Sequence, residues 1–184
     1  MGLATIIRKC KEKEREIRIL ILGLDNSGKS TCLARWLKQD PTDIAPTFGF
    51  QIKTLDQPNF RAVLWDIGGQ ASLRPFWRTY FEDAGDGLLW VIDSADVLRL
   101  TEGLGELAEQ LSLAKCLVLG VIANKQDLAG ALGVEEIEKC LEQLIPKNVR
   151  WRVFGGSALT EPGEVVKAFD WLTTEIRENK LLLY

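Results

Sequence analysis

The chain has 184 residues, 46% of them hydrophobic, and a formal net charge of −3. This size and apolar content fit one globular domain with its own core, and the weakly acidic balance argues against a nucleic-acid-binding protein. Four scattered cysteines without a CxxC pair, and no histidine, argue against a zinc site or a disulfide scaffold and favour free thiols in a reducing cytoplasm. No apolar run approaches about 18 residues, so no membrane-spanning helix is expected.

The first residues, 1–16, are expected to form an amphipathic helix and a linker. Apolar side chains follow the spacing of one helix face at Leu3, Ile6, Ile7 and Cys10. Such a helix could lie on a membrane surface, or dock in a groove of its own domain or of a partner. The pattern for N-myristoylation of Gly2 requires Ser or Thr where Ile6 stands, which argues against that modification.

Residues 17–178 alternate between strand-like and helix-like patterns, and residues 179–184 are expected to be a short tail. Strands are predicted at 17–22, 50–55, 60–66, 88–92, 117–123 and 149–154, and helices at 29–37, 98–113, 135–144 and 165–176. The runs at 88–92 and 117–123 are continuously apolar, as in parallel strands covered on both faces. The alternation predicts an α/β fold with a mostly parallel six-stranded sheet, helices on both faces, and ligands at the carboxyl ends of the strands.

A phosphate-binding loop is predicted between the first strand and the first helix of this domain. Residues 23–30 match GxxxxGK[ST], whose glycines let backbone N–H groups surround phosphate oxygens. Lys29 is expected to reach the β- and γ-phosphates, Ser30 to bind Mg²⁺, and the helix N-terminus to attract the anion. The nucleotide-contacting residues expected here are Gly23, Leu24, Asp25, Asn26, Ser27, Gly28, Lys29, Ser30 and Thr31. Alone, the motif indicates only a nucleoside triphosphate, since ATPases share it.

Two further segments are expected to complete the γ-phosphate end of the site. Asp66 follows a strand, so it is predicted to hold Mg²⁺ through a water molecule, with Gly68 and the Gly69 N–H near the γ-phosphate. Gln70 stands where a GTPase glutamine orients the attacking water. Thr47 is predicted to bind Mg²⁺ only when a γ-phosphate orders its loop, which is the behaviour of a switch.

Asp25 places an acidic side chain inside the phosphate loop, close to the expected γ-phosphate and attacking water. This crowding predicts slow intrinsic hydrolysis that depends on a partner in trans, since no arginine finger is evident in the sequence. A GTP-bound scaffold that does not hydrolyse its nucleotide stays open as an alternative.

Guanine is indicated by residues 124–127, Asn-Lys-Gln-Asp, which follow a buried strand. The Asp127 carboxylate can accept both N1–H and the exocyclic amine of guanine, and adenine would leave it unpaired, which disfavours an ATP-dependent kinase. Asn124 is expected to tie the loop together and the stem of Lys125 to cover the base. A second base-contacting segment is expected after the last strand, comprising Ser157, Ala158 and Leu159. The Ala158 N–H would be offered to guanine O6.

These motifs together resemble the ADP-ribosylation factor (Arf) family of small GTPases, from Met1 to about residue 178. The resembling segments are Gly-Leu-Asp-Asn-Ser-Gly-Lys-Ser at 23–30, Pro-Thr-Phe-Gly-Phe at 46–50, Trp-Asp-Ile-Gly-Gly-Gln at 65–70, Asp-Ser-Ala-Asp at 93–96 and Asn-Lys-Gln-Asp at 124–127. The resemblance implies the P-loop small GTPase fold, a GTP/GDP cycle with Mg²⁺, and a monomer served by an exchange factor and a GTPase-activating protein. It also implies a toggle in which GTP shifts the hairpin at 50–66 and expels the N-terminal helix.

Arf-like members of the family are the nearest in resemblance, and they imply specific partners. These are tubulin-folding cofactors and prenyl-binding carriers of lipidated proteins, with a cytoplasmic location that includes the cytoskeleton, and weak or transient membrane contact. The family's aromatic effector surface corresponds to Phe50, Trp65 and Tyr80, although core packing is the simpler interpretation without the family. Gln51 and Val97 depart from the usual family residues, and a membrane-trafficking role of the Arf type stays open.

Overall fold

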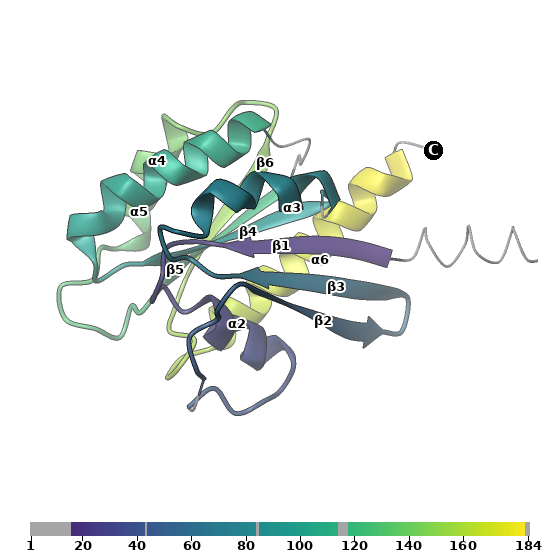
Figure 1. Cartoon of the computed structure of the whole chain (residues 1–184), viewed down its shortest axis with the longest axis horizontal. Coiled ribbons are helices and arrows are strands. Elements are labelled where there is room, and N and C mark those ends of the chain that lie inside the picture. The colour runs from purple at the N-terminus through teal and green to yellow at the C-terminus, as the bar shows by residue number, and fades with distance from the viewer. Residues whose placement is uncertain (1–15, 43, 84, 114–117, 183–184) are drawn as a thin grey trace, which may run out of the picture.

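A computed structural model of the chain describes residues 16–42, 44–83, 85–113 and 118–182 (Figure 1). The N-terminal helix expected at 1–16 lies outside the described residues, apart from Glu16, which begins the first strand. The strands are β1 (Glu16–Leu22), β2 (Phe50–Gln57), β3 (Phe60–Ile67), β4 (Gly87–Asp93), β5 (Val118–Asn124) and β6 (Arg150–Gly155). The helices are α2 (Lys29–Trp36), the 3₁₀ turn η1 (Arg74–Phe76), α3 (Trp77–Asp83), α4 (Val97–Leu113), α5 (Val134–Glu142) and α6 (Gly163–Leu182).

The strands form one six-stranded sheet in the order β2-β3-β1-β4-β5-β6. Every neighbouring pair is parallel except β2 and β3, which form an antiparallel hairpin. The α/β fold with a mostly parallel sheet is therefore confirmed. The hairpin turn is tighter than expected, because β2 continues to Gln57 and only Pro58 and Asn59 separate the two strands.

Burial follows the position of each strand in the sheet. β5 is buried along its whole length, and β4 is buried up to Asp93, as their continuous apolar sequences predict. β2 lies at the edge, and all of its residues are exposed or half-buried. β2 is therefore the strand with the least packing to hold it.

Two apolar cores lie on opposite faces of the sheet, as the layers in Figure 1 show. One core joins the sheet to α2 and α6 through side chains such as Trp36 and Phe169, whose ring centroids are 5.4 Å apart. The other joins it to α3, α4 and α5, where Trp77 meets Trp90 edge-on at 5.8 Å. The expectation of helices on both faces is confirmed.

Two features differ from the sequence expectations. Residues 74–83 form η1 and α3, where no helix was expected, and the buried Trp77 anchors them to the sheet. The tail expected at 179–184 is corrected in part, because α6 continues to Leu182 through a stretch without Gly or Pro. Within the described residues, no helix has the length and apolarity to cross a bilayer.

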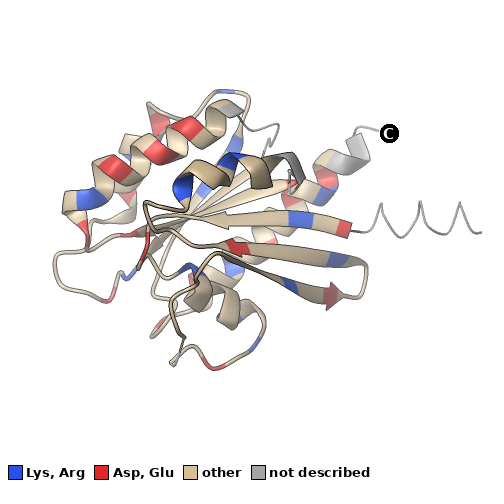
Figure 2. Ribbon diagram, in the orientation of Figure 1, with Lys and Arg blue, Asp and Glu red and all other residues tan. Residues whose placement is uncertain are grey.

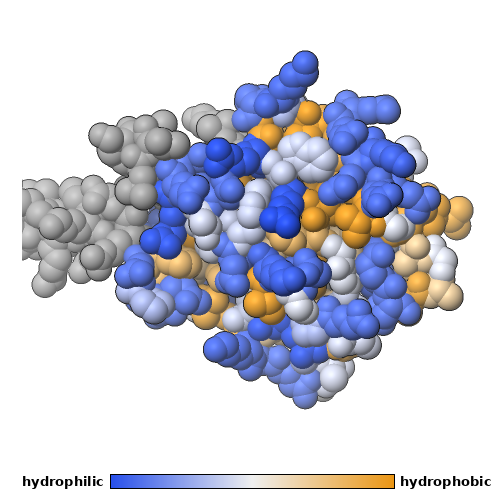
Figure 3. Space-filling view, turned by 180° about the vertical axis from the view of Figure 1, so that it is seen from behind, coloured by the Kyte–Doolittle hydropathy of each residue, from blue (hydrophilic) through white to orange (hydrophobic). Residues whose placement is uncertain are grey.

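Charged side chains are distributed over strands and helices, with a run of acidic residues along α4 (Figure 2). The view from behind shows mostly hydrophilic side chains with apolar ones interspersed (Figure 3). The most exposed large apolar side chains of the described residues include Phe48 and Phe76, which lie on either side of the β2–β3 hairpin in sequence.

Candidate functional site

One cavity of about 600 Å³ opens at the carboxyl ends of the parallel strands. The sequence-predicted residues that line it are Asp25, Asn26, Gly28, Lys29, Ser30, Thr31, Thr47, Gly68, Gly69, Gln70, Asn124, Lys125, Asp127, Ser157, Ala158 and Leu159. Four more predicted residues adjoin this wall without lining the cavity: Gly23, Leu24, Ser27 and Asp66. Five segments far apart in sequence are thus brought to one end of the sheet.

The phosphate loop has the backbone geometry that its glycines permit. Gly23 and Gly28 have φ values of 144° and 94°, which an L-residue rarely adopts. A Cβ at Gly28 would collide with the Asn124 side chain, so this glycine also lets the base-binding loop approach. α2 begins directly after Gly28, which aims its N-terminal N–H groups at the cavity.

Lys29 is the buried cation of this loop, with 6% of its surface exposed. Its Nζ donates hydrogen bonds to the carbonyl oxygens of Gly23 (2.9 Å) and Leu24 (2.7 Å), which curl the loop around it. Burial lowers the pKa of Lys29 from its ordinary 10.5 to about 8, although the nearby carboxylates of Asp66 and Asp25 oppose this shift. A bound phosphate would place a negatively charged oxygen next to this ammonium group, whose hydrogen bonds go to two neutral carbonyl oxygens.

Three side chains converge on one oxygen of Asp66, which is completely buried. Asp66 Oδ2 accepts hydrogen bonds from Ser30 Oγ (2.6 Å), Thr47 Oγ1 (3.2 Å) and Gln51 Nε2 (2.8 Å). Ser30 Oγ and Thr47 Oγ1 are themselves 2.8 Å apart. Asp66 Oδ1 is buried and has no hydrogen-bond partner. This corner gathers oxygen atoms as a hard divalent cation requires, and it leaves one carboxylate oxygen unsatisfied.

Gly68, Gly69 and Gln70 lie between this corner and the phosphate loop. A Cβ at Gly69 would collide with the backbone of Leu24 and Asp25, so only glycine allows this close approach. Gln70 Nε2 donates to the Thr47 carbonyl (3.3 Å), and its Oε1 is buried without a partner. This buried amide oxygen lacks a donor, a deficit that a hydrogen bond from a ligand or a water molecule would relieve.

The base-binding side is held together by Asn124. Its Nδ2 donates to the Ser27 carbonyl (2.8 Å), and its Oδ1 accepts the Ala158 N–H (2.9 Å). Arg35 Nε in turn donates to the Ala158 carbonyl (2.7 Å). The Ala158 N–H, which was expected to be offered to guanine O6, is bonded to Asn124 in this structure. Asp127 is exposed at the rim of the cavity.

Lys125 lies beside this loop in a left-handed conformation with φ of 64°. Its Nζ pairs with the Asp93 carboxylate at 2.7 Å, and Asp93 ends β4. The ion pair draws the Lys125 stem along the cavity wall, where a planar base could pack against it.

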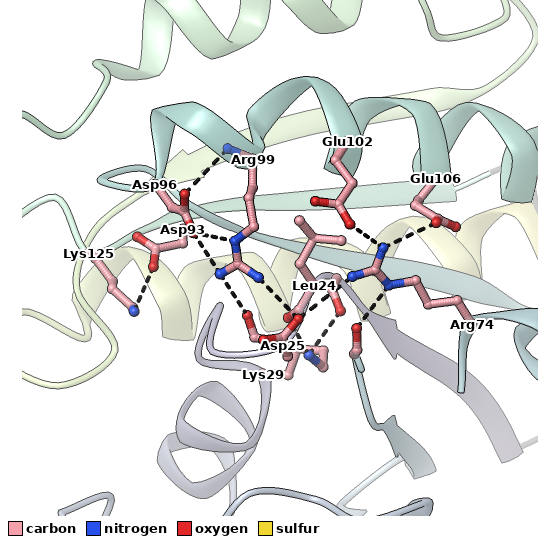
Figure 4. Close-up of polar contacts among 12 residues, drawn as sticks. Leu24, Asp25, Lys29, Arg74, Asp93, Asp96, Arg99, Glu102, Glu106 and Lys125 are labelled. Carbon is pink, nitrogen blue, oxygen red and sulfur yellow. Dashed lines mark hydrogen bonds and ion pairs between the residues drawn. The ribbon is translucent and has the colours of Figure 1, made fainter. Parts of the chain in front are cut away.

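The Asp25 carboxylate points toward α4 (Figure 4). Its Oδ1 lies 3.1 Å from Arg99 Nη1 and 3.6 Å from Arg74 Nη2. Sequence reasoning missed both arginines, which come from α4 and from η1. It also missed cavity-lining residues of the loop before β2 and beside Asp127, which are Pro41, Thr42, Ile44, Ala45, Pro46 and Leu128. Their position between the predicted motifs was the only available signal.

The three aromatic residues of the expected effector surface contact one another. Ring centroids are 6.1 Å apart for Phe50 and Trp65, 5.3 Å for Phe50 and Tyr80, and 6.2 Å for Trp65 and Tyr80. Phe50 is 48% exposed, so the cluster is accessible at the edge of the sheet. It joins β2, β3 and α3 in one apolar patch.

Comparison with known proteins gives a consistent family. The sequence model described as the ADP-ribosylation factor family matches residues 3–176. The ADP-ribosylation factor-like protein alp41 of Schizosaccharomyces pombe is 49% identical, over 98% of this chain and 97% of that protein. ADP-ribosylation factor-like protein 2 of Drosophila melanogaster is 46% identical over 97% of both chains, and that of Arabidopsis thaliana is 44% identical over 100% of both.

A solved structure has the same architecture. The Arl6 BBS3 small GTPase from Trypanosoma brucei, with the bound nucleotide analogue GppNp, superposes with a TM-score of 0.78 at 26% identity. The match covers 89% of this chain and 98% of that one.

Proposed function

Because the chain belongs to the ADP-ribosylation factor family of small GTPases, we propose that it is an Arf-like switch in tubulin folding, microtubule biogenesis and the release of lipidated cargo. As a member, it binds guanine nucleotide and hydrolyses GTP. The observation that carries the specific role is the full-length similarity to relatives named ADP-ribosylation factor-like protein 2, at 44% and 46% identity. The aromatic cluster of Phe50, Trp65 and Tyr80 supports effector binding at the hairpin edge.

The nucleotide would lie across the cavity at the carboxyl ends of the strands. Lys29 would exchange its bonds to loop carbonyls for phosphate oxygens, with the N-terminus of α2 behind them. The Gly69 N–H would approach the γ-phosphate, which its contact with the phosphate loop favours. Asp127 would accept the two guanine donors at the rim, and Ala158 would reach O6 only by sharing its N–H with Asn124.

The residues at the Asp66 corner fit Mg²⁺. Ser30 and Thr47 would supply hydroxyl oxygens, and Asp66 would act through a water molecule bound at its unsatisfied Oδ1. When bound, the ion would neutralise negative charge on the β- and γ-phosphate oxygens. Thr47 can bind there only while its loop is closed over Ser30, so the γ-phosphate would hold the switch loop in place.

Gln70 would orient the water that attacks the γ-phosphate. Its amide nitrogen is held by the Thr47 carbonyl, which leaves Oε1 to accept a hydrogen bond from that water. After hydrolysis, Thr47 would lose its contact at the Asp66 corner and its loop would open. The aromatic effector surface would change as a result. A GTPase-activating protein and an exchange factor would set the rates of these steps.

The proposed role can be tested with the full chain loaded with GDP or with a non-hydrolysable GTP analogue and Mg²⁺. We expect the GTP form, and not the GDP form, to bind a purified tubulin-folding cofactor. It should also release a fluorescent farnesylated peptide from a prenyl-binding carrier.

The Arf-type trafficking alternative has its own outcome in the same assay. GTP-dependent binding to anionic vesicles, with no binding to either protein partner, would contradict the proposed role and support membrane trafficking. Equal binding of both nucleotide forms to the cofactor would contradict a switch. Trp65→Ala should weaken partner binding and leave nucleotide affinity unchanged.

A further inference from the structure

Asp25 is the only acidic residue inside the phosphate loop, between Gly23 and Lys29. A carboxylate at this position would repel a γ-phosphate if it turned toward the cavity that the loop lines. Figure 4 shows it turned the other way, toward α4, where Arg99 and Arg74 share its Oδ1. The side chain is 43% exposed, so it is held by these two contacts and not by burial.

Arg99 holds Asp25 from the first turn of α4. Besides the 3.1 Å contact with the carboxylate, its Nη2 lies 3.4 Å from the Asp25 carbonyl oxygen. Its Nε donates to Asp96 (2.6 Å), which lies three residues earlier, directly before α4 begins. Asp96 therefore fixes the direction of the Arg99 guanidinium. Arg99 contacts both the side chain and the backbone carbonyl of Asp25.

Arg74 holds Asp25 from the other side and is almost fully covered, with 9% of its side chain exposed. Its Nη1 contacts Glu102 (2.5 Å) and Glu106 (3.3 Å), which lie one turn apart on α4 (Figure 4). Its Nε donates to the Gly69 carbonyl (3.0 Å). That carbonyl belongs to the peptide that leads into Gln70, so Arg74 also orients the segment that carries the glutamine.

We propose that Arg99 and Arg74 are positioning residues that hold the Asp25 carboxylate out of the γ-phosphate site and thereby set the preference for GTP over GDP. Only GTP carries the γ-phosphate that an unrestrained Asp25 would repel, so release of the carboxylate weakens GTP selectively. Arg74 has a second effect, because its bond to Gly69 acts on the γ-phosphate sensor without passing through Asp25. The inference rests on the proposed nucleotide site.

A double-mutant cycle separates these routes. The dissociation constants of GDP and of a non-hydrolysable GTP analogue are measured with Mg²⁺ for the wild type, Arg99→Ala, Asp25→Ala and the double variant. Because the Arg99–Asp25 pair is partly exposed, we expect Arg99→Ala to lower the ratio of GTP to GDP affinity by about 2- to 5-fold. In the Asp25→Ala background the same substitution should change the ratio by less than about 1.5-fold.

Arg74→Ala should lower the GTP to GDP ratio in both backgrounds, because Asp25→Ala cannot restore the bond to Gly69. Arg99→Lys provides a second variant that keeps the charge and loses the double contact with Asp25, and it should have a smaller effect than Arg99→Ala. Arg150→Ala is the matched control, since Arg150 pairs with Glu175 on α6 and lies outside the cavity lining. It should leave the ratio unchanged. Far-UV circular dichroism verifies that each variant is folded.

Three results would overturn the inference. They are an equal loss of GDP and GTP affinity in Arg99→Ala, an unchanged ratio in that variant, and a loss that persists in the double variant. The last would mean that Arg99 acts on the phosphate directly. A wild-type chain that binds no guanine nucleotide would instead refute the proposed function, so the two failures are distinguishable.

Discussion

The base-binding half and the γ-phosphate half of the cavity differ in how their polar groups are satisfied. On the base side, Asn124 bonds Ser27 and Ala158, and Arg35 holds the Ala158 carbonyl, so the loops support one another without a ligand. On the γ-phosphate side, Asp66 Oδ1 and Gln70 Oε1 are buried without partners. The loops of the first half are already bonded to one another, although Ser27 Oγ beside them has no partner, and the two buried oxygens of the second half gain partners only with a ligand. A switch requires this asymmetry, because the base keeps the nucleotide bound while the γ-phosphate end changes.

The largest effect is expected from Asn124→Ala, which would break the base-binding half. It removes two buried hydrogen bonds and leaves the Ser27 carbonyl and the Ala158 N–H unpaired. Each unpaired buried group carries a free-energy penalty of about 1–3 kcal/mol. We expect about a 10³-fold loss of affinity for GDP and for the GTP analogue alike. Fluorescent-nucleotide titration measures this, with the exposed Asn148→Ala as control. A selective loss of GTP would contradict the division into two halves.

Gln70→Leu tests the ligand-dependent half through the rate of hydrolysis. Leucine keeps the volume but lacks the acceptor that Oε1 offers to water, so single-turnover hydrolysis should fall about 100-fold. Affinity for both nucleotides should stay within about twofold, because Gln70 bonds only Thr47 in the described structure. Gln39→Leu, on the exposed segment after α2, should hydrolyse GTP normally. Unchanged hydrolysis in Gln70→Leu would remove this residue from the mechanism.

Ser30→Asn sharpens the comparison by altering the Asp66 corner. It removes the hydroxyl that lies 2.6 Å from Asp66 and 2.8 Å from Thr47, and the larger amide separates these two residues. Since only the GTP state needs Thr47 at this corner, affinity for the GTP analogue should fall about 10-fold or more relative to GDP. Ser112→Asn, on the exposed side of α4, is the control. Equal losses for both nucleotides would contradict the assignment.

The sequence predicted the parts of this site that depend on local patterns. A strand signal combined with a chemical motif marks the buried runs of β4 and β5, the glycine-rich loop and the segment at 124–127. The structure brings all of them to the carboxyl ends of the parallel strands. η1 and α3 were not predicted, because Pro75 and the short apolar stretch around Trp77 lack helical periodicity and a cap. Their position is determined by burial of Trp77 against Trp90.

Arg74 and Arg99 could not have been predicted in the same way. Their partner Asp25 is distant in sequence, and only the packing of α4 beside the phosphate loop brings the three together. The acidic pair Glu102 and Glu106 on α4 was a weak signal, because it is more often part of a solvated helix face. Ion pairs between residues far apart in the chain cannot be predicted from the pattern of one sequence.

The smallest expected effect concerns pH and Lys29, which belongs to both halves of the comparison because GDP and GTP both bring a β-phosphate to it. Burial lowers its pKa to about 8 in the described structure, so the ammonium group is lost as pH rises above that value. Phosphate binding needs the charged form. Affinity for GDP and GTP should therefore fall together above pH 8, by up to about tenfold at pH 9, and stay level below pH 7.

Stability without nucleotide should change in the opposite direction. The folded-state pKa of about 8 lies below the ordinary 10.5, so between these values the unfolded chain binds more protons, and the free energy of unfolding contributed by Lys29 rises with pH. Nucleotide titration and urea denaturation from pH 7 to 9, below the range in which guanine N1–H ionises, measure the two trends. Lys29→Arg keeps its charge throughout, and its affinity should not vary over this range. If nucleotide affinity and the free energy of unfolding both fell as pH rose, the low pKa of Lys29 would be wrong. Deprotonation of Lys29 must weaken nucleotide binding and, at the same time, stabilise the ligand-free fold.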